Sequence, residues 1–181
     1  DIDLAVRLST FDMVPHRPDP ERSHSGKLGP GIPEEYETPF PYQFGVNHEN
    51  PTKIDLKETF QFMNLCSELG IKLINTTAGS PYYTPHLQRP AAYPPSDGYQ
   101  PAYDPLIDVA RQIEVVRQLK KQSADGMVIV ASGLSYLQEY LPHVCQALLS
   151  EGWSDMVGLG RVVLSYPDLL NEALGGGDIK K

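Results

Sequence analysis

Two glycine-containing turns follow apolar, strand-like runs of the sequence. The dipeptide SG at 132–133 follows the run 127–131, and GLGR at 158–161 closes the run 155–159. A helical pattern begins directly after each turn. Glycine lets backbone N–H groups come close to an anion, and the start of a helix adds partial positive charge. The guanidinium of Arg161 can add a charge-assisted hydrogen bond to such an anion, worth about 1.5–3 kcal/mol. The two turns and this arginine together predict a phosphate site.

The position of these turns depends on four short apolar runs, which we expect to be strands. A helical pattern precedes each of the last three runs. The runs cover 2–8, 71–75, 127–131 and 155–159. They are rich in Val, Ile and Leu without clean polar alternation, which is typical of strands covered on both faces. Strands that alternate with helices pair in parallel through right-handed crossovers. The sequence therefore predicts an α/β architecture with both turns at the carboxyl edge of one sheet, where such folds bind ligands.

Helix signals support this alternation. A helical pattern covers 55–69, and Asp104 followed by Pro105 predicts the start of a second helix. The pattern 136–149 contains Pro142, where we expect a second segment or a kink. The apolar stripe of the second helix repeats at spacings of three and four: Leu106, Val109, Ile113, Val116 and Leu119.

Two long connections interrupt the regular pattern. They cover 10–53 and 76–103, and both are dense in Pro, Gly and Tyr. Each follows the carboxyl end of a predicted strand. Loops longer than about 15 residues are usually functional or disordered. Since ligand sites of parallel sheets lie at the carboxyl ends of strands, we expect these loops to be functional.

Composition limits the class of protein. A chain of 181 residues is expected to form a single domain over 1–181, since domains average about 150 residues. With 15 basic and 23 acidic residues, a net charge of −8 and no dense basic block, nucleic acid is an improbable partner. No apolar run approaches the roughly 18 residues of a membrane span. Cys66 and Cys145 are expected to be buried thiols, which favours a reducing compartment and a soluble, cytoplasmic protein.

Four segments together resemble a known family. They are VRLS at 6–9, NTTAGSPYYTPHLQRPA at 75–91, VASGLSYLQ at 130–138 and DMVGLGRVVLSYPDLL at 155–170. In this order they look like the carboxyl-terminal half of the old yellow enzyme family, the FMN-dependent NADH:flavin oxidoreductases. The resemblance spans nearly the whole chain. It implies a (β/α)8 barrel of the TIM type, of which this chain supplies four βα units, strands five to eight, as a half barrel.

The resemblance also implies a flavin site. Arg7 matches the family's arginine beside the flavin pyrimidine, where a fixed cation would stabilise the anionic reduced ring. Ser132, Gly133, Gly160 and Arg161 match the family's clamp for the FMN phosphate. The implied cofactors are FMN and, as reductant, NADH or NADPH. The implied reaction is hydride transfer through FMN to an activated alkene or a related acceptor.

The loop after the second run would overhang the flavin face in such a barrel. Tyr82, Tyr83 and His86 lie in this loop and are candidates for the substrate pocket. The other histidines, at positions 16, 24, 48 and 143, lack the spacing of metal ligands, so no metal site is expected.

The usual catalytic residues of the family, His with Asn or His and a Tyr proton donor, belong to the first half of the barrel and have no counterpart here. We therefore expect the chain to need a partner, either an amino-terminal half barrel or another copy of itself. Four parallel strands alone would leave two unpaired edges. The catalytic residues of this chain stay unassigned.

Two other interpretations are open. The first is a half barrel that binds no cofactor and has a structural or assembly role. The second is an enzyme on the same fold with a different phosphorylated ligand, such as an aldolase-type or dihydroorotate-oxidising barrel. An aldolase-type enzyme would show a Schiff-base lysine at a strand end, and no lysine ends any of the four runs.

Overall fold

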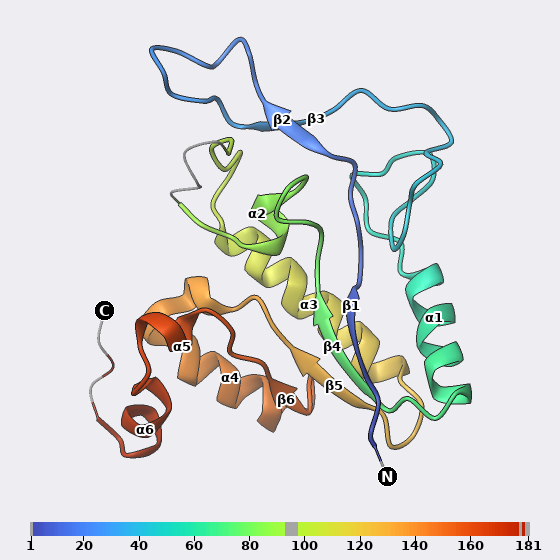
Figure 1. Ribbon diagram of the computed structural model, residues 1–181, viewed down its shortest axis with the longest axis vertical. Coiled ribbons are helices and arrows are strands. Elements are labelled where there is room, and N and C mark those ends of the chain that lie inside the picture. Colours follow the sequence, from blue (N-terminus) through green and yellow to red (C-terminus); the bar gives the residue numbers. More distant parts are fainter. Residues whose placement is uncertain (1, 93–97, 178, 180–181) are drawn as a thin grey trace.

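The structure is a computed structural model that describes residues 2–92, 98–177 and 179. A parallel sheet of four strands forms its centre. The strands are β1 (Ala5–Ser9), β4 (Leu73–Thr77), β5 (Val128–Ala131) and β6 (Met156–Val157). They pair in the order β1-β4-β5-β6, and every pair is parallel (Figure 1). The predicted α/β class with a parallel sheet is therefore confirmed. The fourth strand is shorter than the predicted run and ends at Val157, although the Gly158 amide still donates to the Ala131 carbonyl of β5 at 2.7 Å.

Three helices cover one face of the sheet (Figure 1). They are α1 (Lys57–Glu68), α3 (Leu106–Gln122) and α4 (Leu141–Ser150). Met63 of α1, Leu119 of α3 and Leu148 of α4 are buried in one core with Ile74 and Ile129 of the sheet. Ile74 and Ile129 are fully buried, and they are paired in register. This covered face holds the strand ends at fixed positions.

Helix α3 begins where the sequence indicates, but its buried face is rotated. The Asp104 carboxylate accepts a hydrogen bond of 2.9 Å from the Leu106 amide, as a cap should. The predicted stripe is wrong at Leu106, which is 48% exposed. The buried face instead includes Gln112, whose side-chain nitrogen donates to the Leu87 carbonyl at 2.6 Å. A polar residue satisfied in this way is buried without losing its hydrogen bond.

The pattern 136–149 is divided as expected. The 3-10 helix η1 (Ser135–Tyr140) contains a kink at Gln138, whose φ is 49°, and α4 then carries Pro142 in its first turn. Two short helices, α5 (Val162–Ser165) and α6 (Leu169–Leu174), follow β6. Among the described residues, no helix has the length and apolar character needed to cross a membrane. Cys66 is buried, Cys145 is half-buried, and both thiols are free.

The two long loops pack against each other beyond the carboxyl edge of the sheet. They contain the antiparallel strands β2 (His16–Pro18) and β3 (Gly31–Pro33) and the single turn α2 (Pro85–Gln88). The His16 amide donates to the Tyr83 carbonyl, and the Gly31 amide donates to the Gln100 carbonyl, both at 2.9 Å. Residues 93–97 of the second loop lie outside the described residues. These hydrogen bonds join two segments that are distant in the sequence.

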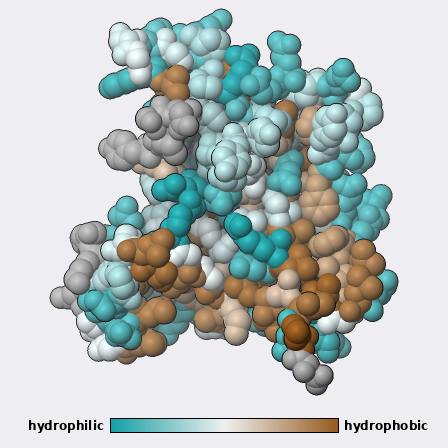
Figure 2. All heavy atoms as spheres, viewed as in Figure 1, coloured by the Kyte–Doolittle hydropathy of each residue, from teal (hydrophilic) through white to brown (hydrophobic). Residues whose placement is uncertain are grey.

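The second face of the sheet is not covered by a helix (Figure 1). The register places Arg7, Asn75, Val130 and Met156 in one row across the four strands, so their side chains share this face. Met156 is 54% exposed. Figure 2 shows hydrophobic atoms over the lower part of the molecule in this view, below the hydrophilic atoms of the long loops. Parallel sheets are normally covered on both faces, so this face is incomplete in the single chain.

Candidate functional site

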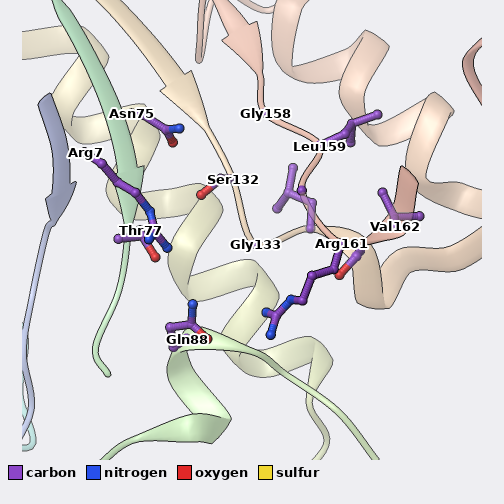
Figure 3. A pocket seen from close by; sticks show the side chains of 13 residues that line it. Arg7, Asn75, Thr77, Gln88, Ser132, Gly133, Gly158, Leu159, Arg161 and Val162 are labelled. Atoms are coloured by element: carbon purple, nitrogen blue, oxygen red, sulfur yellow. The ribbon is translucent and has the colours of Figure 1, made fainter. Parts of the chain in front are cut away.

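A cavity of about 460 Å³ lies at the carboxyl ends of the four parallel strands (Figure 3). We call it the strand-end cavity. Arg7 of β1, Ser132 and Gly133 after β5, and Gly160 and Arg161 after β6 all line it. The parallel register is the physical cause, because it brings the ends of successive strands to the same edge. The structure thus brings together all five residues that were predicted from the sequence to bind a cofactor.

The turn after β5 is fixed by close packing. The Ser132 hydroxyl donates to the Thr76 carbonyl of the neighbouring strand, so its hydrogen is used within the fold. Gly133 has a φ of +82°, and a Cβ at this position would lie 2.4 Å from Oε1 of Gln112. Only glycine satisfies both the left-handed conformation and the close approach. The position of this turn therefore depends on α3.

Backbone amides of both turns are available to a ligand. The amides of Gly133, Gly160 and Arg161 donate to no acceptor among the described residues. A Cβ at Gly160 would meet nothing within 4 Å, so the turn after β6 has open space beside it. Free N–H groups that converge beside a cation form a common type of anion site.

Positive charge is concentrated at this cavity. Arg7 and Arg161 line it, and Arg89 lies near enough for its charge to act on Arg161. None of the three is in a salt bridge with any described carboxylate. Burial, and then the like charges of Arg89 and Arg7, lower the pKa of Arg161, although a guanidinium keeps its proton at any ordinary pH. In a chain of net charge −8, three cations without counter-ions predict an anionic ligand.

Two amide side chains, those of Asn75 and Gln88, also line the strand-end cavity. The side-chain oxygens Oδ1 of Asn75 and Oε1 of Gln88 are buried and have no hydrogen-bond partner among the residues that the structure describes. A buried polar atom without a partner is costly, so each oxygen needs a donor. Because both side chains line the cavity, their amides place further hydrogen-bonding groups beside an anionic ligand.

Sequence reasoning missed part of this site. Asn75 and Thr77 line the cavity from β4, and Gln88 lines it from α2. The first two are separated by one residue at a strand end, so the two-residue period of a strand would have placed them on one face. Gln88 reaches the cavity through the path of a long loop, which also brings the charge of Arg89 close enough to act on Arg161. No sequence signal gives that path.

No family model matches the chain, and no curated protein matches it. What the cavity binds is therefore inferred from its own groups. Within the described part of the chain, no cluster of three or more His, Cys, Asp or Glu side chains could hold a metal ion.

The structure does not bring the three substrate candidates together. His86 lines a second cavity with His16 and Tyr99. Tyr83 lines a third, beside Phe40. Tyr82 is 87% exposed. The reason is that α2 turns the loop, so that Gln88 faces the strand-end cavity while His86 faces away from it.

Proposed function

We propose that this chain is the FMN-binding part of an NAD(P)H-dependent flavin oxidoreductase of the old yellow enzyme type. One observation carries the proposal. The five residues that match the family's flavin site come from β1 and from the turns after β5 and β6, and they line one cavity that has free amides and unpaired guanidinium groups.

The groups of the strand-end cavity fit FMN. A phosphate requires donors and positive charge, which the two turns and Arg161 supply. The ring N–H and the ribityl hydroxyls of FMN need hydrogen-bonding partners, and the amide side chains of Asn75 and Gln88 line the cavity. The volume of about 460 Å³ lies within the usual range for cofactor sites.

Each residue has a defined role in this proposal. Arg161 and the amides of Gly133 and Gly160 hold the phosphate. Arg7, in the middle of β1, supplies a fixed positive charge beside the ring system. Ser132 positions its turn through the Thr76 carbonyl. The chemistry that FMN supplies when bound is hydride transfer from NADH or NADPH to an activated alkene or a related acceptor.

The uncovered face of the sheet is an argument for a partner that packs against it. In a (β/α)8 barrel this face would point to the interior, and β1 and β6 would pair with the strands of the other half. We propose that an amino-terminal half barrel, from the same polypeptide or from another copy, covers Met156 and completes the barrel. That half would supply the catalytic residues, and the enzyme acts on a small molecule.

A sugar-phosphate enzyme is less well supported. A lysine that forms a Schiff base at a strand end is absent from the described lining of the strand-end cavity. A role for Arg7 is also harder to assign in such an enzyme, since a sugar phosphate has no ring that acquires negative charge.

The purified full-length protein tests the function. Flavin absorption in the visible range, and tight binding of added FMN, are the expected results. Riboflavin, which lacks the phosphate, should bind at least 100-fold more weakly, since several charge-assisted hydrogen bonds are lost. Equal affinity for the two flavins would remove the phosphate assignment. If neither flavin binds, the chain is not a flavoprotein, and the structural half barrel becomes the better interpretation.

A further inference from the structure

A second cavity of about 310 Å³ lies between the two long loops, and it shares no lining residue with the strand-end cavity. Four rings line it: His16, His86, Tyr99 and Tyr103. We call it the ring cavity. The ring centroids of His16 and His86 are 4.7 Å apart, and those of His86 and Tyr99 are 5.5 Å apart. Four of its ten lining residues are therefore aromatic, and its volume is at the lower end of the range for small-molecule sites.

The ring cavity carries no uncompensated charge. Arg111 lines it, but its guanidinium is paired with the Asp108 carboxylate and donates to the Tyr103 hydroxyl at 3.1 Å. Burial, and then the electrostatic effects of His16 and Arg111, lower the pKa of His86 to about 3, and burial also lowers the pKa of His16. Both imidazoles are neutral at physiological pH. The chemistry of this cavity is thus opposite to that of the cationic strand-end cavity.

The hydrogen bonds of the two histidines leave an acceptor free. Nδ1 of His16 lies 2.8 Å from the Val14 carbonyl oxygen, which can only accept, so this nitrogen carries the hydrogen. In the neutral ring, Nε2 of His16 then has a lone pair, and it has no partner among the described residues. Nδ1 of His86 is occupied by the Tyr99 hydroxyl at 2.6 Å. A ligand with a donor would satisfy His16.

We propose that the ring cavity binds an uncharged aromatic molecule that carries a hydrogen-bond donor, of the class of phenols and N–H heterocycles. The four rings offer faces and edges for stacked and edge-to-face contacts. The lack of net charge disfavours carboxylates and phosphates, because a buried anion without a counter-ion is costly. Nε2 of His16 accepts the donor of the ligand. This site is independent of the proposed flavin site, because neither needs the residues of the other.

Three ligands of similar size test the proposal on the full-length protein. Phenol has the donor, anisole has the same ring without the donor, and benzoate has a negative charge. Binding at this cavity is followed by the NMR signals of the carbon-bound imidazole protons, each assigned with a variant that lacks one histidine. Phenol is expected to shift the His16 and His86 signals until the site is saturated. Anisole should bind about 10-fold more weakly, because one hydrogen bond is lost. Benzoate should leave both signals unchanged.

A variant pair tests the role of His16. His16→Ala should weaken phenol binding about 10-fold, whereas His24→Ala, an exposed histidine of the same loop, should not change it. Phenol binding that is unaffected by His16→Ala overturns the proposal. So does a failure of phenol to shift either signal, or an equal affinity for anisole. If His16→Ala does not fold, the comparison of phenol with anisole on the unaltered protein decides by itself.

Discussion

Arg7 lies within β1 and Arg161 follows β6, the two edge strands of the sheet, yet their side chains line the same cavity (Figure 3). Neither has a carboxylate partner within the described chain, and the charge of Arg7 is one of the causes that lower the pKa of Arg161, after burial and Arg89. Bringing like charges together costs free energy, and a bound anion reverses that cost. The two arginines therefore select an anionic ligand.

Arg161→Ala should weaken FMN binding by about 2 kcal/mol, or roughly 30-fold, because a charge-assisted hydrogen bond to the phosphate is lost. Fluorescence quenching of FMN during titration measures the affinity. Arg22→Ala is the matched control, since Arg22 is exposed and does not line the strand-end cavity. An unchanged affinity in Arg161→Ala would show that the phosphate lies elsewhere.

Arg7→Ala should slow flavin reduction by NADH or NADPH more than it weakens FMN binding. The reason is that a fixed cation beside the ring stabilises the negative charge that reduction adds. Stopped-flow absorbance with saturating FMN separates the two effects. Arg7→Lys retains the charge and should recover part of the rate. A reduction rate that is the same in all three proteins would contradict the placement of Arg7.

Gly133→Ala should destabilise the fold more than Gly126→Ala does. Both glycines have positive φ, +82° and +76°, so both variants incur about 1–2 kcal/mol of backbone strain. Only at Gly133 would the new Cβ meet another atom, Oε1 of Gln112 at 2.4 Å, which adds about 1–3 kcal/mol of overpacking. Urea unfolding measures the difference. Equal losses in the two variants would mean that Gln112 moves aside freely.

Asp108→Asn should change the pH dependence of stability. Burial raises the pKa of Asp108 from 3.8 to about 6, against the opposing effect of Arg111. Between these two values the folded protein binds more protons at this group than the unfolded chain does, so this group's contribution to stability falls as pH rises from about 4 to about 6. Asp108→Asn has no titrating group at this position, so its stability does not fall for this reason. Its free energy of unfolding relative to the unaltered protein should therefore increase over that window.

Denaturant unfolding at several pH values measures this relative stability. A difference between the two proteins that stays flat, or that decreases with rising pH, would show that pairing with Arg111 outweighs burial at Asp108.

Met156→Gln should destabilise the full-length protein by about 1–3 kcal/mol, although Met156 is 54% exposed in this chain. The proposed partner half would bury this side chain, and a buried amide without partners is costly. Leu69→Gln, at a position that is 67% exposed beside α1, should change stability by no more than about 0.5 kcal/mol. If both substitutions are equally harmless in urea unfolding, the open face is not covered.

Local patterns were sufficient for the main elements. The Asp104 cap and the apolar spacing after it predicted α3, and Pro142 predicted the division before α4. The stripe failed at Leu106 because burial depends on what packs against a helix, and α2 turns the helix face toward Gln112. The hairpin of β2 and β3 was not predicted, because three-residue strands that end in proline carry almost no periodic signal.

The sequence by itself determined the order of strands and helices and the residue types at the strand ends, since spacing, caps and glycines act over a few neighbours. Parallel pairing then fixed that Arg7, Gly133 and Arg161 meet. Only the tertiary structure decided that Arg89 and Gln88 join them, and that His86 faces His16 in a separate cavity. Those contacts depend on the paths of two long loops, which are held by hydrogen bonds between distant segments.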